Sequence, residues 1–496
     1  MSLMRPAAGK DLHLQIQRSL LWTGLQHWGI HAIKFAVLFL LARYISPVSL
    51  GIYALGGTLV SVAQLLSGQG MMAALVQRHN LEDGHKGSAF LSMLVWSLVL
   101  AGVLSLGGRA LVHLLSKTRV ESQVVNVVQI LAWSLPLNAI SNISVALWRR
   151  DLAYKRVAFV TTSSQLVGSL IAVVLAIKGM GVKSLIARQL AEALMMAVLC
   201  ISAAPWRLLR QSSWRRYREI MRVAAPVGGI NLMLLARTRV DELLIGFWLG
   251  AEALGYYALA RRQIDTVSAL VPTVIGSAFS PILSRLQKDE RRLRIVIERG
   301  TRLLGIVVFP AFAAVASIAG EWMPAFLGPR WTPAVPLLQA FALIAAFTAL
   351  LNFNLSILLA TGYPRIRFVL EAIMTGAVLC ATVAALPWGT KAIAYASALA
   401  VGITVPLELT WIARRLPMPI REQLRILWPS LLTTMAMVAV LVALQVGLAH
   451  RWSGASRLSV LIGVALFFLA FDIGRSGSMR KGLHATEEDI LYSSAS

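Results

Sequence analysis

The sequence predicts an all-α polytopic membrane protein with about fourteen transmembrane helices, arranged as two parallel six-helix lobes and two further C-terminal helices. Three observations carry this prediction. First, the chain is 57% hydrophobic and only 14% charged, whereas an average soluble domain contains about 25% charged residues. Second, its basic residues lie in short clusters between long apolar segments. Third, one six-residue motif occurs in each half of the chain.

Apolar segments long enough to cross a bilayer recur along the whole chain. Such a helix needs about 20 mostly apolar residues. The first half holds six candidates, the second half holds six, and two more follow. We expect spans near residues 20–44, 50–72, 88–108, 122–145, 157–178, 183–204, 219–249, 254–283, 300–320, 334–360, 366–387, 391–413, 426–448 and 457–473.

The distribution of basic residues predicts the orientation of these spans. The chain contains 47 Lys and Arg residues and has a formal net charge of +25. If the N-terminus is cytoplasmic and basic residues near the span ends are counted with the adjoining segments, 31 of the 47 basic residues lie in cytoplasmic segments, 10 lie on the opposite side and the rest lie within spans. This asymmetry is the positive-inside pattern. It places both termini in the cytoplasm and explains the net charge by membrane topology, so we expect no nucleic-acid partner.

The spans and the orientation together predict the domain organisation. Each six-span half begins and ends in the cytoplasm, so the halves form a parallel repeat related by an axis along the membrane normal. The predicted parts are a cytoplasmic N-terminal segment (1–18), an N-lobe (19–206), a basic cytoplasmic linker (207–218), a C-lobe (219–415), a final helix pair (416–473) and a cytoplasmic tail (474–496).

The repeated motif supports this parallel arrangement. LGIYAL occupies Leu50–Leu55 and LGYYAL occupies Leu254–Leu259, an offset of 204 residues. Each copy follows the first span of its own half. We expect the glycine to allow a tight turn into the next helix, and we expect the tyrosine to lie at the membrane interface.

Three segments resemble the Wzx-type flippases, in the polysaccharide-synthesis branch of the multidrug/oligosaccharidyl-lipid/polysaccharide (MOP) exporters. In chain order they are LARYISPVSLGIYALGGTLVSVAQLLSGQGMMAALVQR, NLMLLARTRVDELLIGFWLGAEALGYYALARRQ and PILSRLQKDERRLRIVIERGTRLLGIVVFPAFAAVASIAGEWMPAFLGPRWTPAVPLLQ. The similarity extends from about residue 19 to about residue 415 and is greatest to members serving exopolysaccharide export. No single motif in it is a catalytic signature, so its specificity comes from three blocks in the right order.

The resemblance implies two lobes around a central cavity that opens alternately to each side of the bacterial inner membrane. It implies a substrate, an oligosaccharide repeat unit on undecaprenyl diphosphate, moved from the cytoplasmic to the periplasmic leaflet for exopolysaccharide or O-antigen synthesis. Inner-membrane lipids, a polysaccharide polymerase and a co-polymerase are candidate partners. We expect no cofactor; coupling to H⁺, to Na⁺ or only to consumption of the product stays open. The chain contains no G-x-x-x-x-G-K-[ST], H-E-x-x-H or G-x-S-x-G motif, so we expect no enzyme activity.

Ionisable residues inside the spans are candidates for the substrate site. Each costs at least a few kcal/mol at the bilayer centre unless it faces a cavity or a partner. Three acid–base pairs stand four residues apart, a spacing that brings side chains together on a helix; each is either a neutralised structural pair or part of the site. The residues are Lys34, Arg188, Glu192, Arg237, Arg239, Asp241, Glu242, Arg261, Arg262, Asp265, Glu371 and Glu408, and the pairs are Arg188 with Glu192, Arg237 with Asp241 and Arg261 with Asp265.

A diphosphate crossing the membrane needs cationic partners, and guanidinium groups hold phosphate with two parallel hydrogen bonds. Lys34 has no acid one turn away, Arg239 can reach only Glu242, and Arg262 can reach only another helix. The 204-residue offset places Lys34 between Arg237 and Arg239, so equivalent helices of both lobes present positive charge. The predicted substrate-binding residues are Lys34, Arg188, Arg237, Arg239, Arg261 and Arg262; the predicted supporting residues are Glu192, Asp241, Glu242, Asp265, His27 and His31.

His27 and His31 lie one turn apart on the first span. Histidine titrates near neutral pH, so this pair is a candidate for proton coupling or for ordinary polar lining of a cavity. A metal site needs more ligands than the sequence spaces around them, so we expect none.

Two alternative functions remain open at this stage. A transporter of another MOP branch, such as a drug/cation antiporter or a lipid II flippase, would share the two-lobe plan; the cationic bias within the spans argues against cationic drugs but not against lipid II. A membrane polymerase or ligase acting on lipid-linked sugars would need a large periplasmic loop. The predicted outside connections are short, which argues against such an enzyme.

Overall fold

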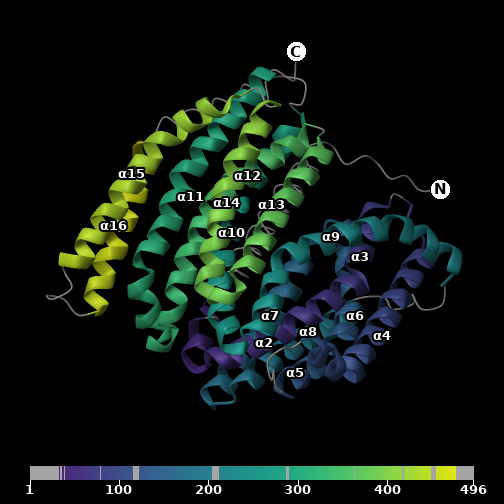
Figure 1. Cartoon of the computed structure of the whole chain (residues 1–496). Helices are drawn as coiled ribbons and strands as arrows, with labels where there is room; N and C mark the ends of the chain where they lie inside the picture. Colours follow the sequence, from purple (N-terminus) through teal and green to yellow (C-terminus); the bar gives the residue numbers. More distant parts are fainter. Residues whose placement is uncertain are drawn as a thin grey trace. The chain divides into compact units, whose positions relative to one another are not determined.

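The computed structural model of the chain describes residues 33, 36–37, 39–78, 80–115, 122–203, 212–285, 290–361, 363–415, 418–447 and 454–475. Helices and short connections make up this described part, and it contains no strand (Figure 1). Every predicted span from 50–72 onward coincides with a helix. Most of the first predicted span, 20–44, lies outside the described residues.

The helices have the length and surface of membrane-spanning elements. Nine segments of the described part are long and apolar enough to cross a membrane, or up to ten if the bent pair in α9 is one span. One of the nine, Arg365–Ala413, contains two predicted spans. Large apolar side chains face outward, such as Leu106 and Val446, which are 89% and 73% exposed. These surfaces suit hydrocarbon rather than water, which confirms the all-α polytopic prediction.

The chain packs as two compact units. The first unit contains the described residues up to Thr266 together with Thr382–Ile393, and the second contains Val267–Ala381 and the described residues from Ala394 onward. The predicted lobe boundary at 207–218 lies partly outside the described residues and stays a prediction.

The first unit contains helices from both halves of the sequence. Segments α9 and α10, which begin the second half, lie beside helices of the first half: α9 packs against α2, α3 and α4. The helices of this unit are α2 (Pro47–Gln64), a π-helical turn (Leu65–Gln69), α3 (Gly70–Gln77), α4 (Asp83–Leu115), α5 (Ser122–Ala132), α6 (Ser134–Arg150), α7 (Tyr154–Ile177), α8 (Val182–Ala203), α9 (Trp214–Trp248) and the first part of α10 (Ala251–Arg285).

Local sequence signals start the two helices that carry the repeated motif. The side chain of Ser46 accepts a hydrogen bond from the backbone N–H of Ser49 at 3.2 Å, and Pro47 occupies the first helical position of α2. Both features are favourable at a helix N-terminus. Before α10, Gly250 has a φ of +89°, a left-handed conformation that glycine adopts at little cost. The chain can therefore leave α9 and enter α10 within two residues.

The two copies of the motif contact each other. A Cβ atom on Gly51 would collide with the Ala251 carbonyl group, and a Cβ atom on Gly255 would collide with the Pro47 carbonyl group. These contacts are equivalent under the 204-residue offset, which relates Pro47 to Ala251 and Gly51 to Gly255. We call this contact the glycine crossing. The glycines lie one turn inside their helices, so they serve close helix packing and not the tight turn that the sequence suggested.

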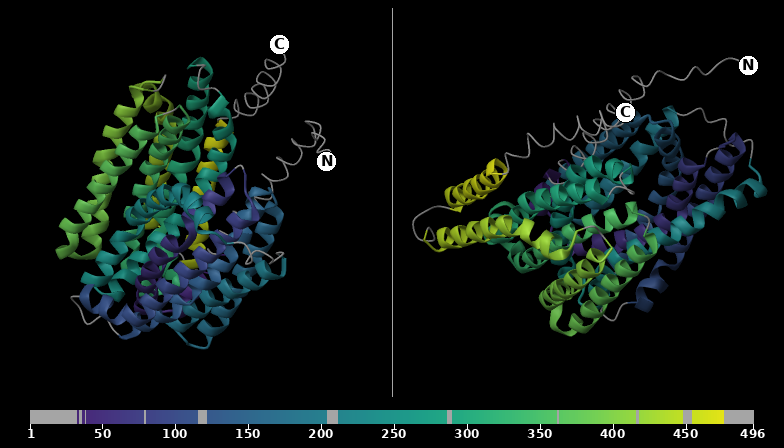
Figure 2. Two further views of the ribbon diagram at one scale, coloured as in Figure 1. Left: turned by 90° about the vertical axis from the view of Figure 1, so that its right-hand side faces the viewer. Right: turned by 90° about the horizontal axis from the view of Figure 1, so that it is seen from above.

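The second unit contains the remaining helices. Figure 2 shows α15 and α16 side by side, and both pack on α11. Met437, Leu441 and Leu461 form a buried apolar cluster between them, and Arg457 pairs with Glu321 of α11 at 2.9 Å. The elements of this unit, with the residues around 382–393 excepted, are α11 (Glu290–Leu327), a 3₁₀ turn (Pro329–Ala334), α12 (Val335–Ala360), α13 (Pro364–Ala385), a 3₁₀ turn (Leu386–Trp388), α14 (Gly389–Ala413), α15 (Ile420–Gly447) and α16 (Gly454–Arg475).

Candidate functional site

Two neighbouring carboxylates of α9 are buried in the first unit. Asp241 is 4% exposed and Glu242 is 1% exposed. A carboxylate so far from water is costly unless it is paired and hydrogen-bonded. Each of the two has both an arginine and a hydroxyl partner, as follows.

Asp241 is bound mainly by α10. The Tyr257 hydroxyl donates to Oδ2 of Asp241 at 2.5 Å, and Nη1 of Arg261 donates to the same oxygen at 2.9 Å. The other oxygen accepts the backbone N–H of Glu242 at 2.9 Å. Arg261 also lies 3.6 Å from Asp265, the partner expected from helical spacing. The predicted pairing of Asp241 with Arg237 involves a side chain outside the described part.

Glu242 connects the two halves of the sequence. Thr58 of α2 donates its hydroxyl to Oε2 at 2.7 Å, and Arg239 donates Nη1 to Oε1 at 2.5 Å. The Arg239 side chain is 33% exposed. Arg239 therefore has a carboxylate partner, and it is the one acid that helical spacing placed within its reach.

Arg262 has a different environment. Its guanidinium lies over the ring of Tyr53, 5.6 Å from the ring centroid, in cation–π geometry. The Tyr53 hydroxyl donates to Oε1 of Gln189 on α8 at 2.8 Å. Among the residues that the structure describes, no carboxylate lies within ion-pair distance of Arg262. The prediction that Arg262 reaches only another helix is confirmed, and its neighbour there is an aromatic ring.

Arg188, which precedes Gln189, also lacks a carboxylate partner in the described part of the chain. Its Nε is buried without a hydrogen-bond partner, and no ion pair joins it to Glu192, so the predicted pair is wrong. Helix α7 packs closely on this turn of α8 at Gly168. A Cβ atom there would be 2.8 Å from the Arg188 carbonyl oxygen and 3.1 Å from Cβ of Glu192.

Tyr53, Tyr257, Thr58 and Gln189 were missed by sequence reasoning. The 204-residue offset was a usable signal for the tyrosines, since it relates Tyr53 to Tyr257. Tyr257 is 1% exposed and bonded to Asp241, so it is not the interfacial anchor that the sequence suggested.

Several predicted residues cannot be placed with these. Lys34, His27, His31 and the side chain of Arg237 lie outside the described residues. Glu371 and Glu408 belong to the second unit, and Glu408 is 3% exposed there. Within the described residues, no three His, Cys, Asp or Glu side chains are placed to hold a metal ion.

The arrangement suits an anionic ligand. The buried carboxylates of α9 are neutralised by Arg239 and Arg261, while Arg188 and Arg262 keep positive charge that no described carboxylate neutralises. Guanidinium groups of this kind can hold phosphate oxygens.

Comparison with known families identifies the chain. Residues 40–336 match the family described as "Polysaccharide biosynthesis protein", and this range is more than half of the 496 residues. The chain belongs to this family. Its resemblance to the polysaccharide-synthesis branch of the MOP exporters is thereby confirmed.

Individual relatives agree with this assignment. The chain is 24% identical over 330 residues to the succinoglycan biosynthesis transport protein ExoT of Rhizobium meliloti, and the match covers 66% of each chain. It is 36% identical over 131 residues to the teichuronic acid biosynthesis protein TuaB of Bacillus subtilis, covering 26% of this chain and 27% of that one. Both matches span less than two thirds of the relative's length.

Solved structures share the fold. The lipid II flippase MurJ in an inward-closed conformation aligns with a TM-score of 0.72 at 13% identity, covering 93% of this chain and 99% of that one. An inward-facing multidrug resistance MATE transporter of the MOP superfamily aligns with a TM-score of 0.54 at 14% identity, covering 80% and 94%. The protein is thus a polytopic membrane protein with the MOP fold.

The pair of Asp241 with Arg261 is expected to be structural. Asp241→Asn leaves a partly buried arginine without its closest acid, and Arg261→Gln leaves a buried carboxylate; breaking such a pair costs about 3–5 kcal/mol. The double variant removes both charges, and Asn still accepts the Tyr257 hydroxyl. We expect thermal unfolding of the purified protein to show each single variant destabilised and the double variant largely recovered. If the double variant is as unstable as the less stable single variant, the two charges do not compensate each other.

Proposed function

We propose that the protein moves an oligosaccharide repeat unit carried on undecaprenyl diphosphate across the bacterial inner membrane by alternating access. The direction is from the cytoplasmic to the periplasmic leaflet, where repeat units of an exopolysaccharide or O-antigen are polymerised. The family assignment and the transport relatives support a transporter, not an enzyme. The positive-inside distribution supports cytoplasmic termini.

One observation carries the substrate assignment. Arg188 and Arg262 lie within predicted spans, and no described carboxylate neutralises either. Tyr53 links their surroundings, because its ring lies under Arg262 and its hydroxyl binds the residue next to Arg188. Positive charge inside a membrane is costly unless it has a partner or a function. A diphosphate supplies the missing negative charge, while Tyr53 and Gln189 offer the aromatic and amide groups that sugars bind.

The paired residues have a different role in this proposal. Asp241, Glu242, Arg239 and Arg261 form a neutral scaffold that holds α9 and α10 against α2. Asp265 lies at the edge of the scaffold, with a side chain that is 54% exposed. The polymerase and co-polymerase stay proposed partners, and no coupling ion is assigned.

Deletion of the gene tests this function. We expect undecaprenyl-diphosphate oligosaccharide to accumulate in the inner leaflet and the surface polysaccharide to disappear, because the polymerising enzymes lose their substrate. A plasmid copy of the wild-type gene should restore both. The distribution is measured by the access of a membrane-impermeant sugar-oxidising reagent in inverted and right-side-out vesicles. Accumulation in the outer leaflet would point to a polymerase, and accumulation of lipid II would point to the other MOP substrate class.

A further inference from the structure

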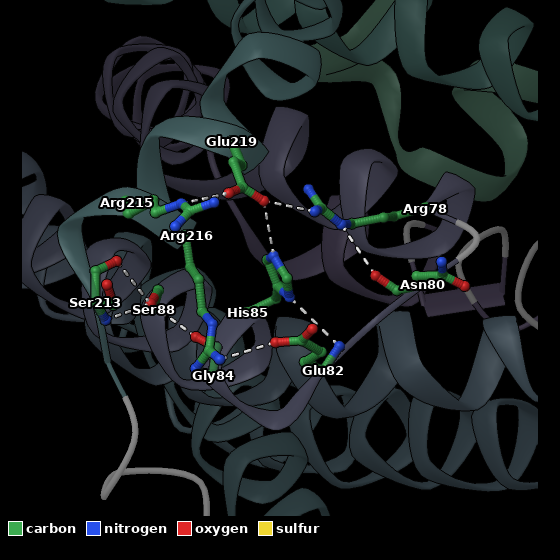
Figure 3. A network of polar contacts seen from close by, with 10 residues as sticks. All are labelled: Arg78, Asn80, Glu82, Gly84, His85, Ser88, Ser213, Arg215, Arg216 and Glu219. Carbon is green, nitrogen blue, oxygen red and sulfur yellow. Dashed lines mark hydrogen bonds and ion pairs between the residues drawn. The ribbon is translucent and has the colours of Figure 1, made fainter.

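A polar network outside the site joins the end of α3 and the start of α4 to the start of α9 (Figure 3). It connects residues more than 120 positions apart in the sequence. We call it the Glu219 network. Its members are Arg78, Asn80, Glu82, Gly84, His85, Ser88, Ser213, Arg215, Arg216 and Glu219.

Glu219 of α9 is the centre of this network. Its Oε2 accepts from Nη2 of Arg78 at 2.7 Å and lies 3.1 Å from Nε2 of His85. Its other oxygen lies 3.5 Å from Nε of Arg215. Arg78 and His85 belong to the first half of the sequence, whereas Glu219 belongs to the second. One carboxylate therefore holds two segments of the first half by charge-assisted hydrogen bonds.

His85 is set up to donate to Glu219. Its Nδ1 accepts the backbone N–H of Glu82 at 3.3 Å, so the proton of the neutral ring is on Nε2, which faces the carboxylate. The His85 residue is 4% exposed. A buried ring with both nitrogens engaged fixes the loop before α4 in one orientation toward α9.

Further bonds join the same two segments. Nη2 of Arg216 pairs with Oε2 of Glu82 at 2.8 Å. The backbone N–H of Ser213 donates to Oγ of Ser88 at 2.9 Å. The guanidinium of Arg216 also lies where a Cβ atom on Gly84 would be, so a larger residue there would have to displace this side chain. Further along α9 from Glu219, α3 and α9 are in backbone contact, since a Cβ atom on Gly70 would collide with the Ala224 carbonyl.

The network and the glycine crossing are two of the contacts between the halves in the first unit; the bond of Thr58 with Glu242 and the packing of α3 on α9 are others. By the predicted topology, the network is cytoplasmic and the crossing is periplasmic. The crossing consists of backbone in direct contact, which has no room for water. The network is solvent-exposed at its periphery, since the side chains of Arg215 and Glu82 are 89% and 61% exposed. Its polar groups can exchange their partners for water when they separate. The apolar contacts beneath them, of Ile220 and Ala224 with α3 and α4, must separate as well.

We propose that the Glu219 network is a cytoplasmic latch, which closes α3 and α4 onto α9 and must open for the substrate to enter from the cytoplasm. The inference rests on the proposed function, because only a transporter that alternates access has to part these segments. The glycine crossing stays closed while the latch opens. Ala224, which is 4% exposed, lies behind the latch and becomes accessible when α3 leaves α9.

Cysteine accessibility tests the latch without any substrate. The test uses a chain carrying Cys200→Ala, Cys380→Ala and Ala224→Cys. In this chain we expect Glu219→Gln to raise the rate at which N-ethylmaleimide labels the cysteine at position 224 by about tenfold, because the network loses the charge-assisted hydrogen bonds of Glu219. Glu298→Gln is the matched control, since Glu298 pairs with Arg302 in an exposed pair of the second unit. Equal labelling rates in the two variants would overturn the proposal.

A disulfide lock gives a second measurement if Glu219→Gln does not insert. Ser88→Cys with Ser213→Cys should cross-link on oxidation, stop polymer output and regain it with a reductant. The matched control is Ser141→Cys, which can pair with the adjacent native Cys200 inside the first half and should leave output unchanged. Full output from the locked latch would overturn the proposal. The labelling result does not depend on what is transported, so a wrong substrate assignment would show in the deletion experiment alone.

Discussion

Arg262→Gln is expected to lower polymer output by about 10- to 100-fold while the protein stays at wild-type level in the membrane. No described carboxylate pairs with Arg262. Its removal therefore leaves no described buried acid without a partner, and we expect the fold to stay intact. A charge-assisted hydrogen bond contributes about 1.5–3 kcal/mol, and each 1.4 kcal/mol changes an equilibrium about tenfold. Arg262→Lys should recover output only in part, because an ammonium cannot bind phosphate through two parallel hydrogen bonds.

The matched control for this prediction is Arg302→Gln, which removes an exposed arginine from the second unit. It should leave output close to wild type. Output is measured as polymer yield normalised to membrane protein level. Wild-type yield from Arg262→Gln would remove Arg262 from the substrate site and leave Arg188 as the described arginine to be tested.

Gly51→Val is expected to have the largest effect on stability. A Cβ atom at this position collides with backbone, the carbonyl group of Ala251, and backbone cannot move aside as the end of a flexible side chain can. Overpacking costs about 1–3 kcal/mol where side chains can adjust, so we expect at least that here. Gly255→Val should act in the same way, because its Cβ would meet the Pro47 carbonyl.

Gly57→Val is the matched control, since Gly57 lies on the same helix and has no atom within 4 Å of an added Cβ. Thermal unfolding in detergent and the yield of monodisperse protein measure the effect. We expect Gly51→Val to lose several degrees of melting temperature and much of the yield, and Gly57→Val to lose neither. Equal behaviour of the two valine variants would show that the glycine crossing does not constrain the fold.

Spans and local pairs were predictable because they depend on neighbouring residues. Apolar runs of membrane length identified each described helix from 50–72 onward, and helical spacing identified Asp265 and Glu242 as acids within reach of Arg261 and Arg239. These are interactions along one helix surface. The same rule failed for Arg188 with Glu192, because helical spacing says nothing about the neighbouring helix α7, whose Gly168 packs closely on this turn of α8.

The partners across helices could not be predicted from the sequence. Thr58 and Glu242 are 184 residues apart, and their bond exists only because α2 packs against α9. Tyr257 reaches Asp241 across the α9–α10 turn. The repeated motif gave partial information, since its offset relates Gly51 to Gly255 and Tyr53 to Tyr257. What it could not show was that the two copies touch, because a repeat gives equivalence and not contact.

The proposed transport is tested most directly by transbilayer movement of the lipid-linked sugar in proteoliposomes. Purified protein is reconstituted with undecaprenyl-diphosphate oligosaccharide, and the fraction reached by an impermeant sugar-oxidising reagent is followed in time. We expect wild-type protein to make the inner-leaflet pool accessible and Arg302→Gln to do the same. The folded double variant Arg188→Gln with Arg262→Gln should not exceed protein-free liposomes. Wild-type rates from the double variant, or no movement with the wild-type protein, would contradict this proposal.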